Sequence, residues 1–211
     1  MKSSILGMYI SKVDIEFLKY LHSVKVASYE QASRDIYHGL KSNSVAKRLR
    51  KLENNKLIEG YRSRTIRHGK KVVSLTKKGF SEFVAKGEEQ RIEIKSDSVE
   101  HDLSLVDIRH RFLQRPKIKR YICENELQTW GKSHDDGIYS AFMNLNSDGL
   151  VVAEGAENLL FLPIEFDAYH KSNSRYEQFF EKYYSSSEVT IALYVCNSKR
   201  IMTQLMKVEE Q

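Results

Sequence analysis

The chain has 211 residues, of which 29% are charged, and its formal net charge is +6 at pH 7. It has no apolar run of about 18 residues, so we expect neither a signal peptide nor a membrane-spanning segment, and we expect a cytoplasmic protein. Its two cysteines, Cys123 and Cys196, stand in apolar segments. This placement predicts buried thiols in a reducing compartment, and the spacing supports neither a disulfide nor a zinc site.

The positive charge is concentrated in the first part of the chain. Residues 1–90 hold 19 Lys and Arg against 9 Asp and Glu, whereas residues 91–211 hold 15 against 19. Binding to a polyanion releases condensed counterions, so this asymmetry predicts a nucleic-acid partner for the first part. A basic helix on a membrane surface is the competing interpretation. It is disfavoured because the cations lack a wide apolar face beside them.

Three helices are predicted in succession at the start of the chain. Residues 12–24 carry apolar side chains at helical spacing, and Ser28 can cap a short helix over residues 29–37. Residues 41–58 then predict a basic helix with Ser42 as its N-cap. The apolar side of this third helix consists of Val45, Leu49 and Leu52.

A basic β-hairpin is predicted after the third helix. Residues 58–64 and 71–75 form its strands, with a turn between them, and the next segment begins Leu-Thr-Lys-Lys-Gly at Leu75. This segment resembles the helix that follows the wing in bacterial winged-helix regulators. In a winged helix-turn-helix, the third helix enters the major groove and the hairpin lies along the DNA backbone. The alternative is a charged, solvated helical hairpin without a ligand.

The predicted DNA contacts come from the third helix and the hairpin. Side chains of the helix are expected to contact bases, and those of the hairpin to contact phosphates. The full set is Ser42, Asn43, Ser44, Lys47, Arg48, Lys51, Arg62, Arg64, Arg67, His68, Lys70 and Lys71.

The second part of the chain predicts a mixed α/β domain. Helices are expected at residues 100–113, 174–184 and 198–208, and strands at 119–127, 138–145, 150–153, 159–168 and 189–196. The predicted fold class is therefore α+β. A winged helix-turn-helix over residues 1–86 is followed by a linker at 87–98 and an α/β domain over 99–211.

Three acidic residues of this domain resemble the motif of the restriction-endonuclease-like PD-(D/E)XK fold. Asp148 follows a turn, and Glu165 and Asp167 lie on the next strand. More closely, the chain resembles the replication-relaxation family of plasmid and mobile-element proteins, which pair a winged helix with such a domain. The further matching features are Glu100-His101-Asp102, Glu124-Asn125-Glu126 with Trp130, Gly149, and Ser174-Arg175-Tyr176 with Lys182-Tyr183.

The resemblance implies a nuclease-like scaffold, but one position departs from the catalytic pattern. In the nucleases, two carboxylates hold Mg²⁺ and the motif lysine activates the attacking water. Here Asp167 occupies the lysine position. We therefore expect no catalytic residues, no metal site and no cofactor, with Glu165 and Asp167 bonded to Arg175 and Lys182. If the domain is instead a nuclease, Mg²⁺ would act with Asp148, Glu165 and Asp167. Lys171 or Lys182 would then replace the motif lysine, and Glu100 could supply a further carboxylate.

These observations together predict a sequence-specific protein that binds double-stranded DNA. Its expected role is transcriptional repression in a plasmid, phage or other mobile element, with the second domain serving dimerisation or partner binding. A homodimer is expected because two half-sites raise affinity and specificity. The alternatives are a Mg²⁺-dependent DNA nuclease targeted by the winged helix, and a replication or mobilisation accessory factor.

Overall fold

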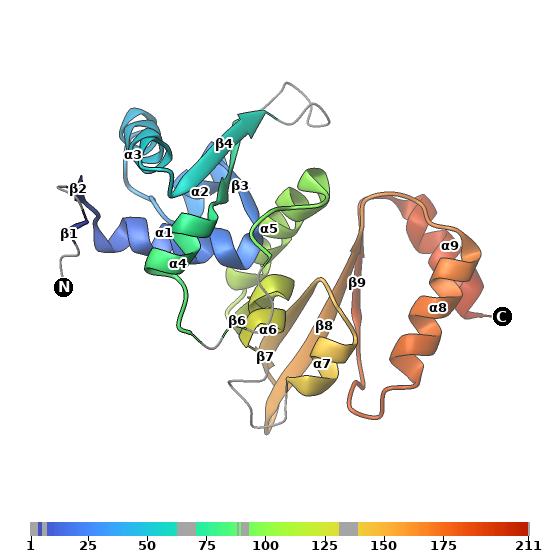
Figure 1. Cartoon of the computed structure of the whole chain (residues 1–211). Helices are drawn as coiled ribbons and strands as arrows, with labels where there is room; N and C mark the ends of the chain where they lie inside the picture. Colours follow the sequence, from blue (N-terminus) through green and yellow to red (C-terminus); the bar gives the residue numbers. More distant parts are fainter. Residues whose placement is uncertain are drawn as a thin grey trace. The chain divides into compact units, whose positions relative to one another are not determined.

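A computed structural model describes residues 4–5, 8–62, 71–87, 89, 93–130 and 139–210, with side chains from Ile10 onward. Over these residues the chain has a mixed α+β fold (Figure 1). It divides into two compact units, Met1–His110 and Arg111–Gln211, here called the N-terminal and C-terminal units. The division falls inside helix α5 (Val99–Leu113), beyond the linker expected at residues 87–98. No helix in the described part of the chain is long and apolar enough to cross a bilayer.

The N-terminal unit combines helices with a small antiparallel sheet whose strand order is β3-β5-β4. Besides the first part of α5, it contains α1 (Lys12–Val24), α2 (Tyr29–Asp35), α3 (Ser42–Asn54), α4 (Lys77–Phe83), β3 (Val26–Ser28), β4 (Ile58–Arg62), β5 (Lys71–Leu75) and the short pair β1 (Ser4–Ile5) and β2 (Met8–Tyr9). The predicted helix at 12–24 and strand at 71–75 are confirmed. Helix α3 ends earlier than expected, and Lys56 just beyond it has a positive φ of 58°.

Side-chain caps fix where α1 and α2 begin. Ser28 caps α2 as predicted, because its hydroxyl accepts from the Gln31 N–H in a capping box. Ser11 and Asp14 form the same arrangement at α1. The predicted cap of α3 is wrong: Lys41 is the N-cap and Ser42 is the first helical residue. The extended backbone of Lys41 aims its carbonyl at the Ser44 and Val45 N–H groups, so Ser42 lies inside the helix.

Close packing explains the glycine of the Leu75-Thr-Lys-Lys-Gly segment. Thr76 caps α4 by accepting a hydrogen bond from the Gly79 N–H at 3.0 Å. A Cβ atom on Gly79 would overlap the carbonyl oxygen of Leu57. The segment thus brings α4 directly against the residue that precedes β4, and only glycine leaves room for that approach.

The C-terminal unit is built on a four-stranded sheet in the order β6-β7-β8-β9. Strands β6, β7 and β8 are antiparallel neighbours, whereas β9 runs parallel to β8 after a crossover through α8. Its elements are β6 (Ile118–Cys123), α6 (Glu124–Trp130), α7 (Ser140–Asn144), β7 (Gly149–Glu154), β8 (Leu159–Asp167), α8 (Asn173–Tyr184), β9 (Leu193–Cys196) and α9 (Lys199–Glu209).

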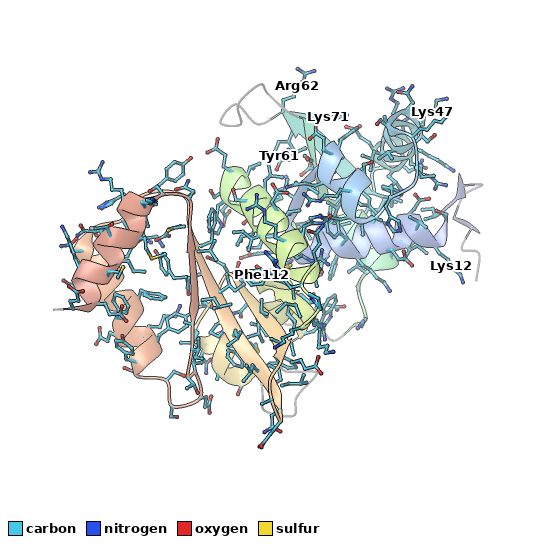
Figure 2. All side chains as sticks on the ribbon, turned by 180° about the vertical axis from the view of Figure 1, so that it is seen from behind. Lys12, Lys47, Tyr61, Arg62, Lys71 and Phe112 are labelled. Atoms are coloured by element: carbon cyan, nitrogen blue, oxygen red, sulfur yellow. The ribbon has the colours of Figure 1, made fainter. Side chains whose placement is uncertain are left out.

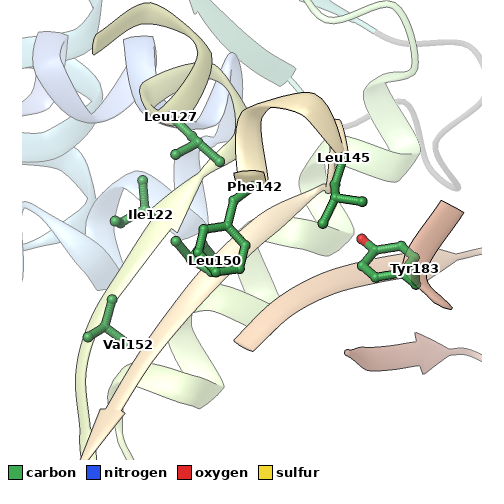
Figure 3. Close-up of a cluster of buried hydrophobic side chains, with 7 residues drawn as sticks. All are labelled: Ile122, Leu127, Phe142, Leu145, Leu150, Val152 and Tyr183. Atoms are coloured by element: carbon green, nitrogen blue, oxygen red, sulfur yellow. The ribbon is translucent and has the colours of Figure 1, made fainter. Parts of the chain in front are cut away.

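Three predicted strands of this unit are wrong in whole or in part. The strand expected at 119–127 stops at Cys123, and α6 begins at Glu124. The segment expected as a strand at 138–145 contains helix α7 instead. Phe142 and Leu145, three residues apart, both enter the buried cluster over β6 and β7, a spacing that a helix provides (Figure 3). Strand β9 is shorter than expected and only half-buried, so Cys196 is partly exposed whereas Cys123 is buried.

Candidate functional site

Helix α3 presents a polar, basic face to solvent. Val45, Leu49 and Leu52 are buried and therefore define its inner side. The residues a half-turn away are exposed, and they are Asn43, Lys47, Arg50, Lys51 and Asn54. Ser42 and Ser44 are exposed in the first turn. Arg50 was not among the predicted contact residues, although its spacing from the three apolar residues places it opposite them.

Arg48 lies on the flank of α3 and has a structural partner. Its Nη1 atom donates to both carboxylate oxygens of Asp14 at 3.1 Å and to the Ser11 hydroxyl at 3.0 Å. Asp14 is buried and also accepts from the Tyr37 hydroxyl at 3.1 Å. Arg48 therefore joins α3 to the beginning of α1. It is not part of the exposed stripe of α3, which contains Asn43, Lys47 and Arg50.

Two further cations stand opposite each other at the end of the hairpin strands. Arg62 on β4 is paired in register with Lys71 on β5 (Figure 2). The Lys71 Nζ atom lies 2.8 Å from Oε2 of Glu53 on α3 and 5.5 Å from the centre of the Tyr29 ring. The hydrogen bond that Lys71 donates to Glu53 raises the pKa of Lys71. Arg64, Arg67, His68 and Lys70 of the predicted set lie outside the described residues.

Gly60 makes room for the contact between α3 and the hairpin. A Cβ atom at this position would lie 2.5 Å from Oε1 of Glu53 and 2.7 Å from Cε of Lys71. Because Gly60 has no side chain, the ion pair between Lys71 and Glu53 can lie across β4. The pair thus connects the base of the hairpin to α3.

A polar network that the sequence did not indicate holds α2 against α5. Arg34 and Gln31 of α2 donate to Oδ1 of Asp107 at 2.6 and 3.0 Å. Asp35 accepts from the Tyr20 hydroxyl at 2.8 Å and lies 2.8 Å from Nδ1 of His110. Burial of Asp35 opposes its ionisation, but the hydrogen bonds from Arg34 and Tyr20 outweigh this and lower its pKa. These bonds therefore fix α2 against α5.

The acidic residues of the nuclease-like pattern form a second cluster, in the C-terminal unit. The Asp148 carboxylate accepts from the Phe166 N–H at 2.7 Å. Glu165 accepts from the Tyr183 hydroxyl at 2.7 Å and from Lys182 Nζ at 3.3 Å. Burial raises the pKa of Glu165, and the nearby Asp148 raises it further.

Asp167 completes this cluster and is buried, whereas Asp148 and Glu165 are half-buried. Its carboxylate accepts from the Tyr194 hydroxyl and is paired with Lys171. Of the two cations predicted as partners for these acids, Lys182 is paired with Glu165, whereas Asp167 is paired with Lys171. Burial raises the pKa of Tyr194 and its hydrogen bond to Asp167 raises it further, so this hydroxyl remains a donor at neutral pH.

The donor set of this cluster does not fit a metal ion as it stands. Each of the three carboxylates is bonded to a protein donor. Across residues 10–62, 71–87, 93–130 and 139–210, no group of three or more His, Cys, Asp and Glu side chains is arranged to hold one. The hydrogen bonds of Glu165 and Asp167 instead connect β8 to α8 and to β9.

Comparisons with known protein families, curated proteins and solved structures find no match to this chain.

Proposed function

We propose that the N-terminal unit binds double-stranded DNA with sequence preference, as a winged helix-turn-helix. The observation that carries the proposal is the exposed stripe of α3, which combines Asn43, Lys47 and Arg50. The paired cations Arg62 and Lys71 lie on the adjoining hairpin. A helix of this kind fits the major groove, and a basic hairpin beside it fits the phosphate backbone.

The exposed residues of α3 supply the groups that base recognition needs. Arg50 can form a paired hydrogen bond to guanine, and Asn43 can do so to adenine. Lys47 and Lys51 would neutralise phosphates on either side of the groove. The cap residue Lys41 makes no side-chain cap bond. The first N–H groups of α3 therefore suit a backbone phosphate.

Arg48 supports this surface without contacting DNA. Its bonds to Asp14 and Ser11 hold α3 on α1. The backbone register of β4 and β5 fixes the two hairpin strands, and the exposed pair between Glu53 and Lys71 adds little to their stability. The bonds of Arg48 fix the angle at which α3 faces a duplex, and a fixed angle lowers the entropy lost on binding.

For the biological role we propose transcriptional repression in a mobile element, with the resemblance to the replication-relaxation family as its support. We assign the C-terminal unit a non-catalytic, nuclease-like scaffold, because its three carboxylates are occupied by Phe166, Tyr183, Tyr194 and two lysines. A homodimer would present two copies of α3 to two half-sites about one helical turn apart.

Selection from a random pool of double-stranded DNA tests the binding proposal. We expect the wild-type chain to enrich a defined motif and the double variant Lys47→Ala/Arg50→Ala to enrich none. Lys207→Ala, an exposed lysine on α9, is the matched control and should enrich the wild-type motif. The proposal would be contradicted if the protein enriched only single-stranded DNA. It would also be contradicted if Lys47→Ala/Arg50→Ala enriched the motif as strongly as Lys207→Ala does.

A cleavage assay tests the scaffold assignment. Wild-type protein in molar excess over labelled double- and single-stranded DNA, with Mg²⁺ or Mn²⁺, should leave the DNA intact. Cleavage that disappears in the variant Glu165→Ala would overturn the assignment in favour of a nuclease. Mapping the DNA fragments bound in cells against promoters and origins separates a repressor from a replication factor.

A further inference from the structure

The final helix, α9, carries an exposed stripe that its own unit leaves uncovered. Ile201, Leu205 and Val208 form its buried side. On the outward side, Met202 is 37% exposed and Met206 is 52% exposed, which is high for methionine. These two residues are one helical turn apart and therefore lie side by side.

Charged residues continue this stripe at both ends of the helix. Lys199 precedes the methionines by three residues and Glu209 follows them by three, so all four share one face. Along this face the order of charge opposes the dipole of the helix, since Lys199 stands in the first turn and Glu209 in the last. Among the described residues, Lys199 makes no ion pair that would compensate for this. A neighbouring helix of reversed direction would compensate at both ends.

We propose that α9 pairs with α9 of a second copy of this chain across a two-fold axis, with the helices antiparallel. An axis through the middle of the stripe sets Met202 against the partner's Met206 and Lys199 against the partner's Glu209. The same contacts recur on the other side of the axis, as an isologous interface requires. The antiparallel direction also brings each helix N-terminus to the partner's C-terminus, which favours both dipoles.

A tyrosine of the neighbouring helix extends this surface. Tyr184 at the end of α8 is 71% exposed, and its hydroxyl donates to Glu209 at 2.6 Å. Its ring stacks on Phe180 with 5.7 Å between ring centres. Exposed tyrosine and methionine are typical of interfaces, and the hydrogen bond holds Glu209 in place at the end of the stripe. Because α9 has only 11 residues, the interface is small and we expect dissociation in the micromolar range.

The inference deepens the homodimer of the proposed function and rests on it only for its biological purpose. The contact itself requires no DNA. It is therefore tested in the absence of DNA, so that failure of dimerisation and failure of DNA binding are separate results.

Sedimentation velocity of the full chain, from about 1 to 100 µM and at low salt, tests the pairing. The wild type should shift from monomer to dimer across this range. Lys199→Glu should weaken the dimer by about tenfold. Because of the two-fold symmetry, this single substitution replaces two attractive pairs with two repulsive ones. Lys207→Glu makes the same change of charge on another side of α9 and should leave the dimer unchanged. Met206→Glu should leave only monomer.

An exchange of charge gives the most specific result. The double variant Lys199→Glu/Glu209→Lys keeps the charges complementary and should recover the affinity lost in Lys199→Glu. Circular dichroism is expected to be unchanged in every variant, since the substituted side chains are exposed. A wild type that stays monomeric at 100 µM would overturn the proposal. So would a dimer that Lys199→Glu and Met206→Glu leave intact.

Discussion

The two units of this chain place their charged side chains in opposite ways. In the N-terminal unit, Lys47 and Arg50 are exposed on one face of α3. In the C-terminal unit, Glu165 and Asp167 lie inside the fold, each bonded to a tyrosine hydroxyl and a lysine. Exposed charges add little to stability, so the row on α3 is not needed for the fold and remains accessible for the proposed contact with DNA. Buried carboxylates need donors in order to be tolerated, so their bonds indicate a structural role.

The largest expected effect concerns the exposed charges of α3. Lys47→Ala/Arg50→Ala should weaken binding to a selected DNA site by about 100-fold, or ~3 kcal/mol, because a base contact and a phosphate contact are both lost. The slope of log affinity against log salt should fall by about 1, because one phosphate contact is lost. Fluorescence anisotropy at several salt concentrations measures both quantities. An unchanged slope would remove α3 from the interface and with it the contrast between the units.

An effect of similar size is expected from a buried histidine of the N-terminal unit. His22 is fully buried against the Phe80 ring, with 5.0 Å between ring centres. Burial lowers its pKa from 6.5 to about 4, and Glu89 offsets this only in part. The unfolded chain therefore binds the proton more readily than the folded chain. Stability from this residue is complete above pH 6.5 and is lost as the pH falls towards 4.

Urea unfolding at a series of pH values measures this loss. The difference between wild type and His22→Gln should change by about 1 kcal/mol between pH 7 and 5.5, and by about 3 kcal/mol below pH 4. Apart from Glu89, whose pKa His22 helps to lower, the carboxylates titrate alike in both proteins and cancel in the difference. A difference that is independent of pH would show that His22 is protonated as easily in the fold as in water.

A third prediction separates Arg48 from its neighbours on α3. Arg48→Ala should lower the free energy of unfolding by about 2 kcal/mol, because it leaves the buried Asp14 carboxylate without its cation. Lys47→Ala and Arg50→Ala should leave thermal unfolding unchanged. Adding Asp14→Asn to Arg48→Ala should recover part of the loss, since the unpaired charge is then gone. Equal stability of all three single variants would place Arg48 among the exposed DNA contacts.

The contrast between Arg48 and Arg50 shows how far the sequence could predict the site. The apolar spacing of Val45, Leu49 and Leu52 predicts which side of α3 is buried, and applied consistently it places Arg50 outward. The partner of Arg48 lies 34 residues earlier in the chain. Such a contact depends on the tertiary fold, so the residues of α3 alone could not reveal it.

The fold shows the same division between local and distant information. Long periodic segments such as residues 12–24 and 159–168 were predicted correctly because their pattern alone determines them. The segment at 138–145 was predicted as a strand. Packing against β6 and β7 instead requires Phe142 and Leu145 on one side, and a helix satisfies that requirement.

A fourth, smaller effect tests the structural role of the acids in the C-terminal unit. Glu165→Ala should destabilise the protein by about 1–2 kcal/mol, because the Tyr183 hydroxyl and Lys182 lose their acceptor. Glu165→Gln should cost less, since it retains an oxygen that can accept from Tyr183, and burial already disfavours the charge. Neither change should alter DNA affinity. If both variants are equally unstable, the charge rather than the acceptor matters, and the contrast with α3 weakens.

The smallest effect is expected at the contact between α3 and the hairpin. The side chains of Lys71 and Glu53 are 41% and 29% exposed, so their pair contributes little to stability. Glu53→Gln removes an acid from the proposed phosphate-binding surface and should raise DNA affinity about twofold at low salt. Lys71→Met removes a cation from the same place and should lower affinity by a similar factor.

Gly60→Ala distinguishes the charge of this pair from its position. The added Cβ would lie within 2.7 Å of both side chains and should push their flexible ends apart without changing any charge. If the pair acts only through charge, Gly60→Ala should bind DNA as the wild type does while Glu53→Gln binds more tightly. If the pair acts by holding the hairpin, Gly60→Ala should weaken binding and Glu53→Gln should weaken it equally. We expect the first result, because the β4 and β5 backbones already fix the two strands in register from Ile58 to Arg62.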